Sequence, residues 1–176
     1  MAKNWGCYAA GSKCYNNDPA YCETYGRLYD WATAMALPSS CNSNSCTSQI
    51  SAKHRGICPS GWHIPSDTDW NVLMKFVNPS CSDNSTCDGA GTKLKATSNW
   101  YNNGNGTDEF GFAALPGGDG DSDGNFDNAG YNGYWRSASE GSANYAYSRR
   151  MYYNREYAGW GHHYKDVLQS VRCLQD

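Results

Sequence analysis

The strongest structural signals in the chain lie in the stretch Cys58-Pro59-Ser60-Gly61-Trp62-His63-Ile64-Pro65-Ser66-Asp67-Thr68-Asp69-Trp70. Residues 61–64 predict a short strand. Ser66 is then the expected N-cap of a helix, and Asp69, three residues later, completes a pair that resembles a capping box. The helix has an apolar stripe at helical spacing and ends at Asn78-Pro79; the stripe consists of Trp70, Leu73, Met74 and Val77.

On the N-terminal side of this stretch, the signals are weaker. Residues 1–25 are rich in Cys, Asn and Tyr and predict strand and loop, and residues 38–53 predict a polar loop. Between them, a short amphipathic helix that ends at Pro38 is predicted by the spacing of Leu28, Trp31, Ala32 and Met35.

On the C-terminal side of the helix, Gly, Asn and Asp interrupt short aromatic runs. Residues 101–133 predict long loops, and short strands are expected at 134–137, 145–153 and 167–174. Gly159 and Gly161 flank Trp160 and disfavour a regular element there, so Trp160 is expected to be exposed. Two helices followed by a set of strands predict an α+β fold, with the helices packed on a small, mostly antiparallel sheet.

The length of 176 residues suits one domain, which we expect to span 1–176. The hydrophobic fraction of 39% includes Tyr and Cys, so apolar burial alone is marginal for this length. Cross-links are therefore expected to brace the fold.

Nine cysteines are available for this purpose. Three close pairs lie in polar loops, a fourth pair can join the middle of the chain to its end, and Cys7 is left over. The expected bonds are Cys14 with Cys22, Cys41 with Cys46, Cys81 with Cys87, and Cys58 with Cys173. Sequence does not fix connectivity, and several free buried thiols are the alternative.

Disulfides indicate an oxidising compartment, so an extracellular or cell-surface location is expected. No signal peptide follows Met1, and we expect it to have been removed from this chain. No run approaches the roughly 18 apolar residues of a membrane span. The net charge of −3 offers no basic footprint, which disfavours nucleic acid as a partner.

Eight of the fourteen tyrosines lie between Tyr131 and Tyr164, among Ser, Asn, Gly, Arg and His. Rigid amphipathic rings between small hydrogen-bonding residues are typical of evolved binding surfaces. The segment predicts noncovalent binding of a protein or polysaccharide ligand by a monomer. A structural or adhesive envelope protein is the alternative, for which the same face would pack against other subunits or polysaccharide.

Five blocks of the chain resemble, in order, the signature blocks of the Fibrobacter major paralogous domain family. Besides residues 58–70 they are Tyr25-Gly26-Arg27-Leu28-Tyr29-Asp30-Trp31, Gly111-Phe112-Ala113-Ala114-Leu115-Pro116-Gly117-Gly118, Gly133-Tyr134-Trp135-Arg136-Ser137 and Ser170-Val171-Arg172-Cys173. The resemblance implies a bacterial protein with a C-type-lectin-like fold, related to the formylglycine-generating-enzyme type. Arg172 resembles a structural arginine of that fold, and the paired C-terminal cysteines of the enzyme are absent.

Some proteins of this fold class are the variable proteins of diversity-generating retroelements, and residues 136–164 are similar to their variable region. A family member with a fixed ligand is the alternative. The expected ligand contacts are Arg136, Ser139, Glu140, Tyr145, Tyr147, Tyr152, Tyr153, Arg155, Tyr157, Trp160, His162, His163 and Tyr164. Trp31, Trp62, Trp70 and Trp135 are expected in the core.

Four carboxylates at alternate positions, Asp119, Asp121, Asp123 and Asp127, suit a structural calcium ion, although the bidentate Glu of an EF-hand loop is missing. A solvated acidic turn is the alternative, and no cofactor is required. No nucleophile motif points to catalysis, so we expect no enzyme. A hydrolase would need a carboxylate pair, of which Asp108 with Glu109 and Glu140 with Glu156 are examples.

Overall fold

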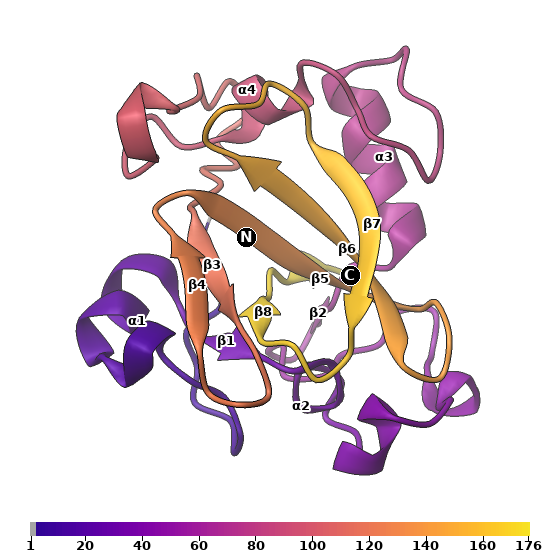
Figure 1. The fold of residues 1–176 in the computed structure, drawn as a ribbon. Helices are drawn as coiled ribbons and strands as arrows, with labels where there is room; N and C mark the ends of the chain where they lie inside the picture. Colours follow the sequence, from indigo (N-terminus) through magenta and orange to yellow (C-terminus); the bar gives the residue numbers. More distant parts are fainter. Residues whose placement is uncertain (1–2) are drawn as a thin grey trace.

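The computed structural model describes residues 3–176, so Met1 and Ala2 of the predicted lead-in lie outside the described residues. The fold combines short helices with β-sheet and four disulfides, as the α+β prediction requires (Figure 1). The helices are α1 (Pro19–Tyr25), α2 (Trp31–Met35), α3 (Asp67–Val77) and α4 (Ala90–Leu94). The strands are β1 (Leu28–Tyr29), β2 (Trp62–His63), β3 (Gly117–Gly120), β4 (Phe126–Ala129), β5 (Asn132–Glu140), β6 (Tyr145–Tyr152), β7 (Gly159–Tyr164), β8 (Gln169–Ser170) and β9 (Leu174–Gln175).

Strand β5 is the centre of the main sheet. One edge of β5 pairs along its length with β6, which in turn pairs with β7. The other edge pairs in parallel with β3 at Gly133 and with β8 at Trp135. Strand β8 also pairs with β1, and β9 pairs with β2. The C-terminal strands thus lie beside strands from the first 63 residues of the chain.

Helix α3 forms as the sequence predicts. Ser66 accepts the backbone N–H of Asp69, and Asp69 Oδ2 accepts the backbone N–H of Ser66 at 2.8 Å, which completes the capping box. Trp70 and Met74 of this helix are buried with Trp135 and Met151 of the sheet. Helix α3 therefore covers one face of β5 and β6, which we call the helix face.

The core tryptophans are largely as expected. Trp31, Trp70 and Trp135 are buried, whereas Trp62 is half-buried. A second group of buried residues, which includes Tyr29, Trp31 and Met35 of β1 and α2, packs around the disulfides Cys41–Cys46 and Cys58–Cys173.

All four predicted disulfides are present: Cys14–Cys22, Cys41–Cys46, Cys58–Cys173 and Cys81–Cys87. Cys7 is a free, exposed cysteine. Because the Cys58–Cys173 bond joins residues 115 positions apart, it ties the start of the β2–α3 block to the chain end. In the described residues no helix combines the length and apolar character needed to cross a membrane.

The predicted elements near the N-terminus need correction. Part of the lead-in is helix α1, which Asp18 caps and Pro19 begins. Leu28 belongs to strand β1, because the following helix α2 starts only at Trp31, where Asp30 caps it. Leu28, Trp31 and Met35 have the spacing of one helical stripe, so the prediction assigned the strand residue Leu28 to the helix.

The hairpin of β3 and β4 lies within residues 101–133, for which the sequence predicts long loops, and helix α4 lies in a stretch without a predicted helix. Glycine is required in the hairpin because the space beside it is filled. A Cβ on Gly118, whose φ is +67°, would lie 2.4 Å from the carbonyl oxygen of Asp127, and one on Gly120 would lie 2.9 Å from the Phe126 ring. These glycines thus mark close packing of strands rather than a long loop.

Strand β7 also lies where flanking glycines predicted no regular element. The Arg150 side chain crosses the strand at Gly159, where an added Cβ would lie 2.9 Å from Arg150 Cγ. Trp160, on the opposite face, is half-buried rather than exposed because it stacks on Tyr147 and donates to Asp67. The predicted strand at 167–174 is two separate short strands, β8 and β9.

Candidate ligand-binding surface

Residues 136–164 form the end of β5 and all of β6 and β7, which lie next to one another in Figure 1. Successive side chains of a strand point to opposite faces, so this segment divides its side chains between two surfaces. The residues of β6 that share a face with Arg149 point to the helix face, and the others point to the far face.

The helix face of β6 and β7 carries one continuous row of rings. We call it the ring stripe, and its members are Tyr145, Tyr147, Trp160, His162 and Tyr164. Tyr145 lies 4.4 Å from Tyr164 and 5.0 Å from His162, and Tyr147 stacks on Trp160 at 5.2 Å, all measured between ring centroids. His162 is exposed, Tyr164 is 54% exposed, and the other three rings are half-buried.

The ring stripe begins at the N-terminus of α3. Trp160 Nε1 donates a hydrogen bond of 2.7 Å to Asp67 Oδ2. Beside it, Arg149 is fully buried and donates to Asn71 Oδ1 at 2.5 Å and to the Ser85 carbonyl at 2.9 Å. The helix thus anchors one end of the stripe, whereas Tyr145 and Tyr164 at the other end extend beyond it.

The far face of the sheet carries a separate aromatic group. His163 packs against Tyr134 at 5.5 Å, and Tyr152 contacts both Tyr134 and Tyr157 at 6.3 and 6.1 Å, measured between ring centroids. Burial lowers the pKa of His163 to about 4, with Arg136, Arg150 and His162 adding positive charge. His163 is therefore a neutral ring at pH 7. We call this group, with Arg150, the far-face cluster.

Tyr153 belongs to neither surface. It meets Tyr101 and Tyr131 edge-on at 5.4 and 5.6 Å, and these two rings stack at 4.3 Å. Arg155 is exposed in the loop between β6 and β7. The segment that the sequence treats as one surface is therefore three.

Three of the predicted contacts have structural roles. Arg136 is fully buried and donates to the carbonyl groups of Tyr164, Lys165 and Val167. Ser139 Oγ accepts the backbone N–H of Asp67 at 2.9 Å.

Glu140, whose side chain is 3% exposed, pairs with the fully buried Lys165 at 3.0 Å. A ligand on the surface cannot reach Arg136 as placed, because residues 164–167 cover its guanidinium group. Glu140 lines the hollow beside the 47–53 loop, but its carboxylate is already bound by Lys165, Cys46 and Thr47. The sequence offers no signal for this, since burial at these positions depends on the residues of 165–168 and 41–47 that fold over them.

The run of aspartates forms the β3–β4 hairpin. Asp121 Oδ1 accepts the backbone N–H groups of Asp123 and Asn125, and Asp119 Oδ1 accepts the side-chain amide of Asn128. Asp119 and Asp127 lie opposite each other across the two strands. Within residues 3–176, His, Cys, Asp and Glu form no group of three that could hold a metal. The hairpin alone accounts for these roles of Asp119 and Asp121, and calcium stays a prediction.

The carboxylates considered for hydrolysis are dispersed. Burial raises the pKa of Asp67 and of Asp119, but Asp67 lies on the helix face, and Asp119 affects the pKa of Tyr134 and Tyr152 on the far face. Glu109 forms an ion pair with Lys93 at 3.8 Å, and Asp108 accepts the backbone N–H of Ala113. The two carboxyl groups with raised pKa thus do not share a cleft.

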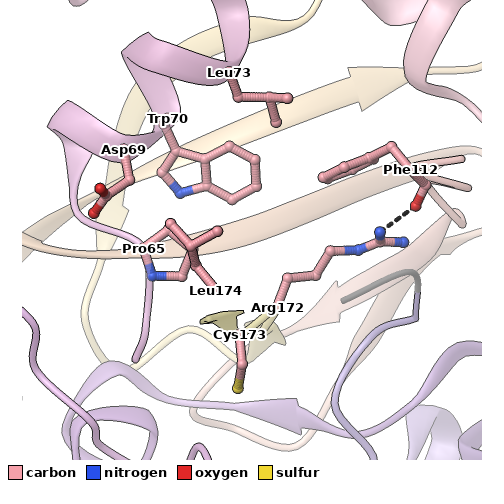
Figure 2. Close-up of a pocket in the computed structure, with 8 residues that line it drawn as sticks. All are labelled: Pro65, Asp69, Trp70, Leu73, Phe112, Arg172, Cys173 and Leu174. Atoms are coloured by element: carbon pink, nitrogen blue, oxygen red, sulfur yellow. Dashed lines mark hydrogen bonds between the residues drawn. The ribbon is translucent and has the colours of Figure 1, made fainter. Parts of the chain in front are cut away.

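A small apolar pocket of about 160 Å³ lies between α3 and the chain end (Figure 2). Trp70, Leu73 and Phe112 form its walls, and Leu174 closes one side. Arg172 is buried beneath it, with its guanidinium 4.0 Å from the Phe112 ring centroid and a hydrogen bond to the Phe112 carbonyl. The structural role expected for Arg172 agrees with this placement, and no residue of 136–164 lines the pocket.

Sequence reasoning missed Asp67, Tyr134 and Arg150 as parts of the two surfaces. Asp67 carries only a helix-start signal in the sequence, and Tyr134 sits in a block expected to be structural. Their positions next to the rings come from strand register and from the docking of α3, which no local pattern encodes.

Comparison with protein families gives one finding. The family model described as the Fibrobacter succinogenes major domain matches residues 2–175. Neither the curated proteins nor the solved structures yielded a match. Since the family model covers nearly the whole chain, the chain belongs to the Fibrobacter succinogenes major domain family.

Proposed function

We propose that this chain is a noncovalent ligand-binding module that holds a protein or glycan ligand against the ring stripe. One observation carries the proposal: five partly exposed rings form a single row on one face of β6 and β7. Rings fixed by strands and by each other lose little conformational entropy on binding, so their contact area contributes efficiently to affinity. The far-face cluster is the smaller candidate surface, because Tyr134 is only 6% exposed.

The fold assignment that goes with this function is C-type-lectin-like. It is supported by the strand before α3, by the pairing of β1 with β8, and by the Cys58–Cys173 bond that joins the α3 block to the chain end. The four disulfides support an extracellular or cell-surface location, where such bonds persist.

We further propose that residues 136–164 are the diversified region of a retroelement variable protein. Four ring-stripe positions alternate along β6 and β7, whereas Arg136 of β5 and Arg149 of β6 are fully buried. Diversification should therefore concentrate at Tyr145, Tyr147, His162 and Tyr164. Sequencing the neighbouring DNA tests this, since it should contain a reverse transcriptase gene and a near-repeat that differs from this gene at adenines in those codons. A repeat that differs equally at the codons for Arg136 and Arg149 would contradict the assignment.

The binding proposal is tested with the immobilised chain, a glycan microarray and a displayed random-peptide library. Tyr145→Ala and Tyr164→Ala should each weaken the binding of any selected ligand at least tenfold, as expected for aromatic anchors. Tyr8→Ala is the matched control, because Tyr8 is 77% exposed and lies outside the sheet. Ligands that bind all three variants as well as the parent chain would exclude the ring stripe as the contact.

The structural or adhesive role is the second candidate, favoured by one feature: β7 pairs only with β6 and leaves a strand edge beside the rings. Light scattering separates the two. A monomer at micromolar concentration supports ligand binding, and concentration-dependent growth that Tyr164→Ala abolishes supports assembly through this edge.

A further inference from the structure

Two hollows flank the N-terminus of α3 beside the inner end of the ring stripe. One, of about 470 Å³, is lined by residues that include Asp67, Asn84 and Tyr147. The other, of about 630 Å³, lies between the 47–53 loop and the end of β5. Thr68 and Ser139 line both hollows, so together they form a trough that crosses the end of α3 and meets the stripe at Tyr147.

The trough has the lining expected of a site for a hydroxylated ligand. Among its lining residues, six are charged and seven carry aliphatic hydroxyl or amide side chains: Thr47, Ser51, Ser66, Thr68, Asn71, Asn84 and Ser139. Tyr147, stacked on Trp160, supplies an aromatic wall at one end. Polar groups that can both donate and accept, together with a ring face, match a sugar, which has hydroxyl groups and an apolar face of C–H bonds.

Asp67 is the buried polar group of this trough. Its residue is 8% exposed, and Oδ2 accepts the Trp160 Nε1–H, whereas Oδ1 has no hydrogen-bond partner among residues 3–176. Oδ1 is itself enclosed, so a hydroxyl group in the hollow would reach it after the carboxylate turns toward the hollow. Because a buried carboxylate oxygen without a donor is costly, that hydrogen bond would gain free energy.

The charges of the trough are already balanced. Asp67 is close enough to the buried Arg149 that each affects the pKa of the other, and Asp83 pairs with Lys75 at 2.8 Å. In the second hollow, Asp69 accepts hydrogen bonds from Ser66 in the capping box and lies 3.6 Å from His63. Glu140 of the same hollow pairs with Lys165, and Lys53 is exposed. What Asp67 Oδ1 lacks is a hydrogen-bond donor rather than a counter-charge, which favours a neutral hydroxylated ligand over a cationic peptide.

We infer that the trough across the N-terminus of α3 is a subsite for a neutral oligosaccharide, one of whose hydroxyl groups donates to Asp67 while a sugar ring lies against Tyr147. The inference rests on the proposed function, because the ring stripe continues the same surface. It extends that function to residues outside 136–164 and fixes the ligand class.

Affinity electrophoresis of the full chain in gels that contain galactomannan, xylan, hydroxyethyl cellulose or dextran tests the inference, with anionic polygalacturonate for comparison. At least one neutral polysaccharide should retard the chain. Asp67→Asn keeps an acceptor for Trp160 but turns the Oδ1 position into a donor, and Thr68→Val removes an exposed hydroxyl at constant shape. Each substitution should lower the association constant for the polysaccharide, as measured from the retardation, at least tenfold.

Thr97→Val is the matched control, because Thr97 is exposed and lines neither hollow, and it should behave as the parent chain. Thr68→Val also guards against misfolding, since Thr68 is exposed.

Retardation that Tyr164→Ala weakens but Asp67→Asn and Thr68→Val do not would overturn the trough and leave the ring stripe intact. Retardation by polygalacturonate alone, or by no polysaccharide while selected peptides still bind through the stripe, would overturn the ligand class. A chain that binds neither polysaccharides nor peptides would overturn the proposed function as well.

Discussion

The surroundings of Lys165 and the ring stripe differ in how their large side chains are used: the first are buried and hydrogen-bonded, and the second are partly exposed. Lys165 is fully buried, and its ammonium group donates to the carbonyls of Cys41, Asn44 and Ala143 and to Glu140, at 2.9–3.1 Å. The rings of the stripe, whose member Tyr164 directly precedes Lys165, mostly contact each other and remain partly exposed. Stability therefore resides in buried, hydrogen-bonded groups such as Lys165 and in the disulfides, whereas the stripe is available for recognition. Substitutions should therefore separate stability from binding.

The largest loss of stability should follow removal of the long cross-link. Replacing Cys58 and Cys173 by Ala should lower the free energy of unfolding by about 4–5 kcal/mol, and replacing Cys81 and Cys87 by about 2 kcal/mol, because closing a longer loop restricts the unfolded chain more. The loops span 115 and 6 residues. Urea unfolding of both variants measures the two losses of unfolding free energy. Equal losses would show that loop entropy does not explain how the disulfides stabilise the fold.

Lys165→Met should cost about 4 kcal/mol, because it leaves Glu140 as an uncompensated buried charge. The double variant Glu140→Gln/Lys165→Met should recover part of that loss, and Lys53→Met, at an exposed position, should cost almost nothing. Chemical denaturation gives all three values. A double variant no more stable than the single one would mean that the carbonyl contacts, and not the ion pair, make Lys165 important.

His163 should make stability depend on pH. Its folded pKa of about 4 lies below the ordinary value of 6.5, so the unfolded chain takes up a proton first as the pH falls. The contribution is complete above pH 6.5 and is lost between about 6.5 and 4, on the order of 2 kcal/mol after solvent screening. The difference between the unfolding profiles of the parent chain and His163→Gln should show this window.

His162→Gln is the control for that experiment, because His162 is exposed and lies on the opposite face of β7. A parent chain and a His163→Gln variant with parallel pH profiles would show that the far-face cluster does not hold His163 neutral.

The smallest loss of stability should come from the ring stripe itself. Tyr164→Ala should change the free energy of unfolding by less than about 1 kcal/mol, since only cross-strand contacts with Tyr145 are lost at an exposed position. Tyr29→Ala, at a fully buried ring, should cost at least about 3 kcal/mol. Thermal and urea unfolding compare the two, and similar losses would remove the distinction between the stripe and the interior.

Local patterns predicted those elements whose signals are complete within a few residues. The capping box of Ser66 and Asp69 specifies α3, and the short spacings of three cysteine pairs identify local cross-links. Aromatic residues at 145–153 indicate the strand that is β6. Glycine-rich segments misled the prediction, because Gly118 and Gly159 satisfy close contacts with Asp127 and Arg150 that exist only in the folded sheet.

The sequence by itself determined the family, the α+β class, the close spacing of three cysteine pairs and the concentration of aromatic rings near the C-terminus, because each depends on residue types at short or repeated spacings. The structure decided the cysteine connectivity. Only the tertiary structure decided which of those rings share a face. That choice depends on the register of β5, β6 and β7, on the register shift between Arg136 and Glu140, and on where α3 docks. A shift of one residue exchanges the two faces of a strand, and pairing between distant segments, rather than local preference, sets that register.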